Sequence, residues 1–72
     1  LQTMNIKQLQ YFVKVAECGG FSQAADALHL AQSALSRHIR LLEEELNTRL
    51  FNRTGRGATL TEQGEYLLAH ST

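Results

Sequence analysis

The sequence has 72 residues, and its formal net charge is zero because seven basic side chains balance seven acidic ones. This length makes one small domain, too short to enclose a substrate cleft beside a hydrophobic core. No apolar run reaches the length of a membrane span, and Cys18 has no second cysteine with which to form an internal disulfide. We therefore expect a cytoplasmic domain with no membrane partner. Residues 1–3 are expected to be an addition ahead of a natural start at Met4.

The first predicted helix covers residues 5–18. Asn5 is a residue type that caps helices, and Gln8 follows it at the spacing of a capping box. Gly19 and Gly20 end the helix, because glycine readily takes the left-handed conformation found at helix C-termini. The residues expected to face the core recur at helical spacing and are Ile6, Leu9, Phe12, Val13 and Ala16, with Tyr11 and Val15 widening the stripe.

Two more helices are predicted in residues 21–46, FSQAADALHLAQSALSRHIRLLEEEL. The shorter one covers about residues 22–28, with Ser22 as its candidate cap, and its alanines allow a second helix to approach closely. The longer one starts near Gln32 and ends by Asn47, a residue type that tolerates the left-handed conformation. A short helix, a tight connection and a longer helix are typical of a helix-turn-helix.

The longer helix has two faces of different chemistry. An apolar stripe at helical spacing predicts the buried face, and it consists of Leu35, Ile39, Leu42 and Leu46. Another side carries hydroxyl and guanidinium groups, which can reach base edges and phosphates, on Ser33, Ser36, Arg37 and Arg40. We interpret this helix as a DNA-reading element.

The two ends of this helix also differ. Ala31 stands at the cap position and has no side-chain acceptor, so the first amide groups of the helix are left to meet a DNA phosphate. Glu43, Glu44 and Glu45 are interpreted as a solvated helix end. Five arginines fall within twenty residues, at positions 37, 40, 49, 53 and 56. Because the positive charge is concentrated there, a net charge of zero does not exclude a nucleic-acid partner.

A β-hairpin is predicted after residue 49. Residues 50–53 and 58–61 are the strand candidates, and the sequence TGRG between them is a glycine-containing turn. Thr61 then caps a fourth helix with Tyr66, Leu67 and Leu68 as its apolar residues. The order helix, helix, helix, hairpin, helix predicts a mainly α winged helix-turn-helix.

The sequence resembles the DNA-binding domain of LysR-type transcriptional regulators over nearly all of residues 4–72. Three ordered blocks carry the resemblance: YFVKVAE, FSQAADALHLAQSALSRHIRLLEEEL and LFNRTGRGATLTEQG. It departs at the start of the longer helix, where many members have Ser-Gln-Pro in place of Ala31-Gln32-Ser33. The resemblance implies a bacterial transcription factor with residues 4–61 as the winged domain and residues 62–72 as the truncated start of a linker helix.

The resemblance also implies roles for individual residues. Base contacts in the major groove fall to Gln32, Ser33, Ser36 and Arg37, in agreement with the polar face described above. From the residues themselves, Arg40, one turn further along the helix, is expected to reach a phosphate, and Arg53 and Arg56 on the glycine-rich wing are expected at a minor groove or its phosphates. Ser22 and Gln23 are expected to offer backbone amides to a phosphate, although a simple helix cap explains them almost as well.

Oligomerisation and effector binding follow from the resemblance as well. Such proteins bind DNA as dimers, or as tetramers when full-length, and the dimerisation helix here would include Tyr66, Leu67 and Leu68. No cofactor is expected in this segment, because a small-molecule effector would bind only a C-terminal domain beyond it. The alternative is a winged-helix module that docks a protein partner without reading DNA, but helix 32–46 has no exposed run of leucine or aromatic residues.

Catalytic and metal-binding interpretations find little support. Ser36 and His38 are two residues apart on a helix, so their side chains point away from each other. His29, His38, His70 and Cys18 do not have the spacing of a metal site. We expect the domain not to be an enzyme.

Overall fold

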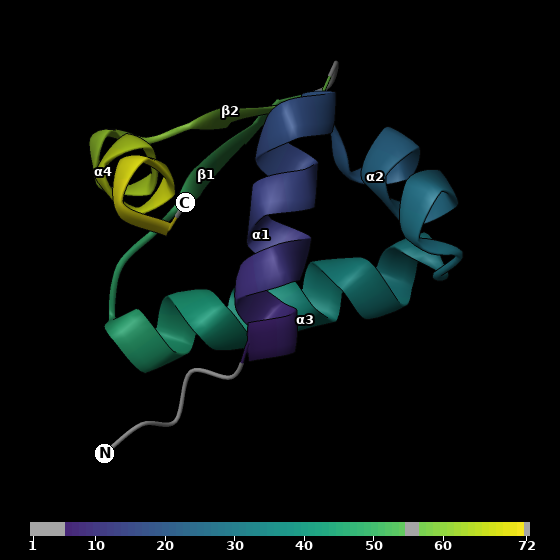
Figure 1. Ribbon diagram of the computed structural model, residues 1–72, viewed down its shortest axis with the longest axis horizontal. Helices are drawn as coiled ribbons and strands as arrows, with labels where there is room; N and C mark the ends of the chain where they lie inside the picture. Colours follow the sequence, from purple (N-terminus) through teal and green to yellow (C-terminus); the bar gives the residue numbers. More distant parts are fainter. Residues whose placement is uncertain (1–5, 55–56, 72) are drawn as a thin grey trace.

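The computed structural model describes residues 6–54 and 57–71. The predicted cap Asn5 and the wing residue Arg56 therefore lie outside the described residues. The elements in chain order are α1 (Ile6–Cys18), α2 (Phe21–Leu28), α3 (Gln32–Leu46), β1 (Phe51–Thr54), β2 (Gly57–Leu60) and α4 (Glu62–Ser71) (Figure 1). This order confirms the predicted mainly α winged helix-turn-helix, and no described helix is long and apolar enough to cross a membrane.

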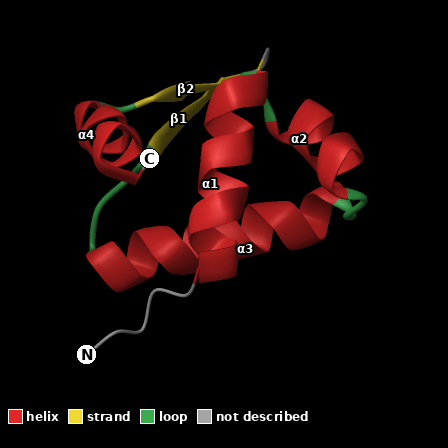
Figure 2. Ribbon diagram, viewed as in Figure 1, coloured by secondary structure: helices red, strands yellow, loops and turns green. Residues whose placement is uncertain are grey.

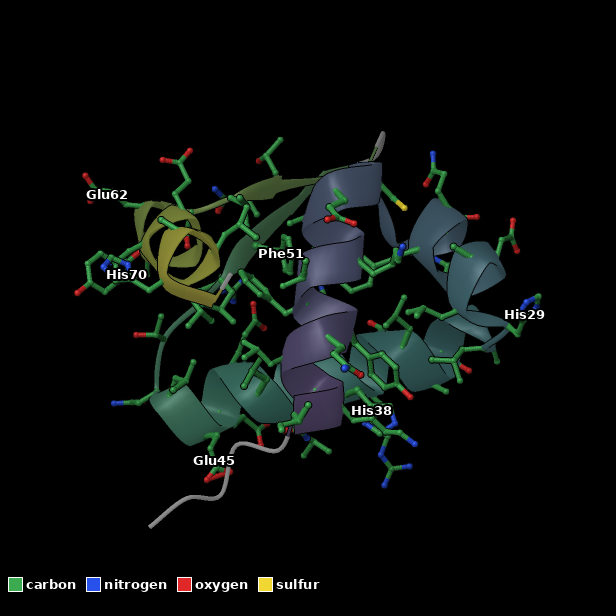
Figure 3. All side chains as sticks on the ribbon, in the orientation of Figure 1. His29, His38, Glu45, Phe51, Glu62 and His70 are labelled. Carbon is green, nitrogen blue, oxygen red and sulfur yellow. The ribbon has the colours of Figure 1, made fainter. Side chains whose placement is uncertain are left out.

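The core lies where α1 crosses α3. Figure 1 shows α2 on one side of α1 and the hairpin with α4 on the other, and Figure 2 shows the two strands beside this helical body. Phe51 points inward behind α1 (Figure 3), and its ring lies 5.4 Å from that of Phe12 and 5.6 Å from that of Phe21. The largest fully buried side chains are Phe12, Val15, Leu35, Ile39, Leu42, Leu50 and Phe51.

The predicted apolar stripes are correct in their middles and wrong at their ends. Ile6 is 73% exposed and Leu46 is 37% exposed, although both were expected to face the core. Ile6 begins α1, and because helical side chains tilt toward the N-terminus, its side chain points past the α1–α3 contact. Leu46 ends α3, after which the chain turns away toward β1. Val15, expected only to widen its stripe, is fully buried.

The helix ends use left-handed residues, as the glycine and asparagine signals predicted. Gly19 has φ +77° after α1, and Asn47 has φ 52° after α3. His29 ends α2 in the same conformation, with φ 58°. In both α2 and α3 the next two amides bond back into the last turn; after α3, Asn47 N donates to Glu44 O and Thr48 N to Glu43 O. This pair of bonds is a Schellman motif, which satisfies carbonyls that a helix end leaves free.

The hairpin is antiparallel, with Phe51 opposite Leu60 and Arg53 opposite Ala58. Each strand begins one residue away from its predicted start. The Ala58 amide lies 3.5 Å from the carbonyl oxygen of Gly19, so β2 is held against the turn that follows α1. The wing is therefore attached to the helical body close to its tip.

Thr61 caps α4, as predicted. Its Oγ1 accepts a hydrogen bond from the Gly64 amide at 3.0 Å, and the same hydroxyl donates to the carbonyl of Arg49 at 2.6 Å. The Thr61 amide in turn donates to the carbonyl of Leu50 at 3.0 Å. One threonine thus starts α4 and joins it to the segment that leads into β1.

Candidate nucleic-acid interface

The outward face of α3 carries the residues predicted to read bases. Gln32, Ser33, Arg37 and Arg40 are exposed, and Ser36 is half-buried. The opposite face holds Leu35, Ile39 and Leu42, which are fully buried, so the burial of one stripe directs the other toward solvent. The structure therefore brings the five predicted α3 site residues onto one accessible surface.

Two shallow surface grooves lie along this face and meet at Ser33, Arg37 and Leu41. One is lined further by Ser36 and Arg40, and the other by Ala34 and His38. Leu41 is 44% exposed, but it is a single apolar side chain between arginines, so the face has hydrogen-bonding groups on both sides of it. Such a surface suits a ligand that is itself polar or negatively charged.

Arginine charges on this face are not neutralised by carboxylates. Within residues 6–54 and 57–71, the ion pair that the structure contains joins Lys14 to Glu17 at 3.8 Å, and both residues belong to α1. Among these described residues, the guanidinium groups of Arg37, Arg40 and Arg49 therefore have no carboxylate within ion-pair distance, while Glu44 and Glu45 are exposed at the C-terminal end of α3. The neutral charge of the chain conceals this uneven distribution.

The start of α3 has free backbone donors. Ala31 has extended backbone and makes no side-chain cap, as predicted, and the first helical hydrogen bond runs from Leu35 N to Ala31 O. The amides of the first turn, residues 32–34, consequently have no partner within the helix. They lie beside the exposed side chains of Gln32 and Ser33.

The start of α2 differs from the prediction. The helix begins at Phe21, and Gly20 occupies the cap position, so Ser22 does not cap it. Phe21 enters the helix because its ring is buried against Phe51. Ser22 and Gln23 remain exposed in the first turn, and since the first bonded amide is that of Ala24, their amides are free of intrahelical bonds.

Arg53 occupies a position that the sequence did not reveal. Its Nη1 donates a hydrogen bond to Ser36 Oγ at 2.9 Å, and its guanidinium carbon lies 4.4 Å from the centre of the Phe21 ring. The side chain therefore joins β1 to the reading face of α3 and to the start of α2. The sequence analysis placed Arg53 with Arg56 on a wing that reaches DNA, and only this geometry shows that Arg53 contacts Ser36, a predicted base-contacting residue.

Glu43 is not part of a solvated helix end, and that interpretation is wrong. Its Oε2 accepts hydrogen bonds from the Leu50 amide at 2.8 Å and the Phe51 amide at 3.2 Å. The carboxylate thus holds the entrance of β1 against the end of α3. Glu44 and Glu45 are exposed, and Glu45 points outward in Figure 3, so the interpretation holds for those two.

Arg49 belongs to the same region and was not singled out as a site residue. A surface groove between the C-terminal half of α3 and β1 is lined by Arg40, Glu43, Glu44, Asn47, Thr48, Arg49 and Arg53. Three of these side chains are guanidinium groups, while the Glu43 carboxylate is occupied by backbone amides. The clustering of arginines in the sequence was the available signal for Arg49.

The predicted dimerisation residues occupy two environments. Leu67 and Leu68 are half-buried and pack against the core, whereas Tyr66 is 69% exposed. The Tyr66 ring stacks on His70 with 4.2 Å between ring centres, and both lie on the outer side of α4. Their role in self-association stays a prediction.

The histidines and the cysteine are dispersed. His38 packs its ring edge-on against Tyr11, with 5.1 Å between ring centres, while His29 and His70 lie at opposite sides of the molecule in Figure 3. Among the described residues, no three histidine, cysteine or acidic side chains come together as metal ligands. Cys18 is half-buried.

A comparison with protein families gives one decisive match. The family described as "Bacterial regulatory helix-turn-helix protein, lysR family" matches residues 6–65. The chain belongs to this family. The match covers α1 to the first turn of α4, so it includes every part of the surface described above.

Relatives of this LysR-family chain are regulators of greater length. It is 48% identical over 68 residues to the nitrogen assimilation regulatory protein nac of Escherichia coli, covering 94% of this chain and 22% of that protein. It is 49% identical over 65 residues to the transcriptional regulator TfdT of Cupriavidus pinatubonensis, covering 90% of this chain and 28% of that protein. The chain thus spans about a quarter of these relatives.

Solved structures give the same assignment. The chain is similar to the BenM DBD in its complex with catB site 1 DNA, with a TM-score of 0.89 and 42% identity over 93% of this chain and 74% of that one. It is also similar to full-length CbnR complexed with its target DNA, with a TM-score of 0.90 and 39% identity over 93% of this chain and 23% of that one.

Proposed function

We propose that this domain binds double-stranded DNA sequence-specifically and serves transcriptional regulation. The exposed, arginine-bearing face of α3 carries the proposal, because its polar side chains project from a helix whose other face is buried. The similar BenM and CbnR structures were solved with DNA, which supports the same use of the fold. A protein-docking function would require an extended apolar surface, whereas the exposed large apolar side chains of α3 are Leu41 and, at the last position of the helix, Leu46.

The residues divide by the chemistry that they can offer. Gln32, Ser33, Ser36 and Arg37 are proposed to contact base edges from the major groove, since amide, hydroxyl and guanidinium groups match donor and acceptor patterns there. Arg40 and Arg49, together with the free amides of Ser22 and Gln23, are proposed to bind phosphates. Arg56 remains the proposed minor-groove residue of the wing.

Several properties of the whole protein belong to the same proposal. The domain acts without a cofactor or catalytic activity, in the bacterial cytoplasm, and any small-molecule effector binds a further C-terminal domain. It binds DNA as a dimer through α4 and its continuation, and as a tetramer when full-length. A dimer would recognise a partly palindromic site with half-sites one helical turn, or a multiple of it, apart.

Selection of bound sequences from a random duplex pool tests the proposal. The selected sites should be partly palindromic, and titration should show two chains per site. Arg37→Ala should relax base preference at a cost of about 1–3 kcal/mol, whereas Arg56→Ala should weaken binding to all sequences and reduce the salt slope by about 1. Unchanged binding in both variants, or no enrichment from the pool, would contradict the proposed function.

A further inference from the structure

Arg53 touches two elements of the DNA-reading surface without itself projecting from α3. Its guanidinium donates to Ser36 Oγ at 2.9 Å and lies against the Phe21 ring. We propose that Arg53 is a positioning residue that makes Ser36 a hydrogen-bond donor toward DNA and thereby selects guanine at the base that Ser36 contacts. This inference rests on the proposed function and adds a specificity rule to it.

The donor–acceptor chemistry of the two side chains is the first step. A serine hydroxyl has one hydrogen to donate and two lone pairs, whereas a guanidinium group has donors only. In the Arg53–Ser36 bond the serine oxygen must therefore be the acceptor. Its own hydrogen has to point away from Arg53, and one of its lone pairs is already used. The hydroxyl keeps its donor and one of its two lone pairs for the next partner, so its capacity to accept is halved and its capacity to donate is not.

The electrostatic field acts in the same direction. The Arg53 guanidinium carries a positive charge, and its nitrogen lies 2.9 Å from Ser36 Oγ. A donor from a base, such as the amino group of cytosine, would approach this oxygen against that charge. An acceptor atom would instead be attracted. Both effects oppose a base donor at Ser36.

Packing keeps the guanidinium in place. Arg53 lies on β1, opposite Ala58 across the hairpin, so the strand pairing fixes its backbone. The guanidinium carbon is 4.4 Å from the centre of the Phe21 ring, a distance at which a cation is attracted to the face of an aromatic ring. Phe21 is itself buried against Phe51. The donor is thus oriented before DNA binds.

The base edges of the major groove then determine the preference. Guanine presents two acceptors there, N7 and O6, whereas cytosine presents the amino donor. Adenine presents one acceptor beside a donor, and thymine presents one acceptor beside a methyl group. A hydroxyl whose hydrogen points away from Arg53, and whose remaining lone pair lies in a positive field, fits guanine best. Ser36 without Arg53 would accept or donate to any of these edges.

The first experiment uses the 72-residue chain and Ser36→Ala, selected in parallel on random duplex pools. The position whose base preference changes in Ser36→Ala identifies the base that Ser36 contacts. We expect a G·C pair there, and in the wild type 7-deazaguanine or 2-aminopurine at that position should lower affinity about three- to tenfold, by removing N7 or O6. An A·T pair, no altered position, or insensitivity to both analogues would overturn the inference.

The second experiment separates positioning from folding. Arg53→Met keeps an apolar stem against Phe21 but has no donor, so it should relax the base preference at that one position. Adding Ser36→Ala to this variant should then change the base preference no further. Arg53→Lys, which retains a charged donor, should keep more of the preference. Arg40→Met removes a guanidinium that makes no hydrogen bond to Ser36 among the described residues, and it should lower affinity for all sequences with the base preferences unchanged. Thermal unfolding verifies that each variant is folded.

The outcomes distinguish this inference from the function on which it rests. An unchanged profile in folded Arg53→Met, alongside a changed profile in Ser36→Ala, would refute the role of Arg53 and leave DNA binding intact. If Arg53→Met does not fold, the identity of the base pair at Ser36 and its response to the two analogues still decide the question. Failure of the wild type to enrich any sequence would overturn the proposed function and this inference together.

Discussion

The two ends of α3 differ in how their polar groups are used. At the C-terminal end, Asn47 closes the helix through a Schellman motif, and the Glu43 carboxylate accepts the amides of Leu50 and Phe51. At the N-terminal end, Ala31 supplies no cap, and the amides of the first turn have no helical partner. Polar groups at the C-terminal end thus form hydrogen bonds within the molecule, whereas the backbone amides at the N-terminal end remain available to a ligand.

This difference assigns stability and recognition to separate parts of one helix. Groups that are already hydrogen-bonded gain little from a new ligand, whereas unpaired donors beside exposed polar side chains can form new bonds at little internal cost. The boundary lies near Ser36, which is half-buried and already accepts one bond from Arg53. Substitutions at the C-terminal end should therefore act on folding, and those at the N-terminal end should act mainly on binding.

The largest effect is expected at Glu43. Glu43→Ala removes the acceptor of two backbone amides, one of them on the buried Phe51, and we expect a loss of about 2–3 kcal/mol in the free energy of unfolding. Glu43→Gln keeps a neutral acceptor and should lose less, because hydrogen bonds to a charged oxygen are stronger. Urea denaturation followed by circular dichroism measures both values.

Glu44→Ala is the matched control for this comparison. The side chain of Glu44 is one residue away and exposed, so its removal should change stability by less than about 0.5 kcal/mol. If Glu43→Ala and Glu44→Ala prove equally mild, the contact between the α3 end and β1 contributes nothing and the distinction between the helix ends fails.

The role of Glu43 also marks what the sequence could reveal. Periodicity predicted the buried face of α3 because Leu35, Ile39 and Leu42 repeat with the helix itself. The cap at Thr61 and the left-handed Asn47 could likewise be predicted, since local chemistry determines them. Glu43 could not, because its partners are amides seven and eight residues ahead, and nothing in a run of three glutamates separates one from the next.

The same distinction between local and long-range contacts explains which parts of the candidate site could be predicted from the sequence. The polar face of α3 follows from helical spacing, so its candidate base readers could be listed from the sequence. The Arg53–Ser36 bond spans 17 residues and depends on where the hairpin lies relative to α3. Likewise, Ser22 has the chemistry of a cap, but burial of Phe21 extends α2 by one residue and gives that position to Gly20. Tertiary packing outweighed local preference at both places.

A smaller effect is expected at Asn47. Its φ of 52° and ψ of 45° lie in the left-handed region, which costs a residue with an ordinary Cβ about 1 kcal/mol or more. Asn47→Ala should therefore lower the free energy of unfolding by about 1 kcal/mol, while Asn47→Gly should leave it equal or higher. Chemical denaturation measures the free energy of unfolding of both variants. If Asn47→Ala were as stable as Asn47→Gly, the left-handed backbone conformation would not be what determines this end of α3.

The smallest effect is expected at the opposite end, and it has the opposite sign. Ala31 already has the extended backbone of a cap residue, with φ −67° and ψ 142°, and it is exposed. Ala31→Ser adds a hydroxyl that can accept a first-turn amide, so it should raise the free energy of unfolding by about 0.5–1 kcal/mol. Ala34→Ser makes the same chemical change three residues later, inside the helix, where serine is a poorer helix former than alanine and should lower stability by a few tenths of a kcal/mol. Denaturation midpoints that shift in opposite directions for the two variants would show that the first-turn amides of α3 lack hydrogen-bond acceptors. Equal shifts would mean that these amides already have partners in solution.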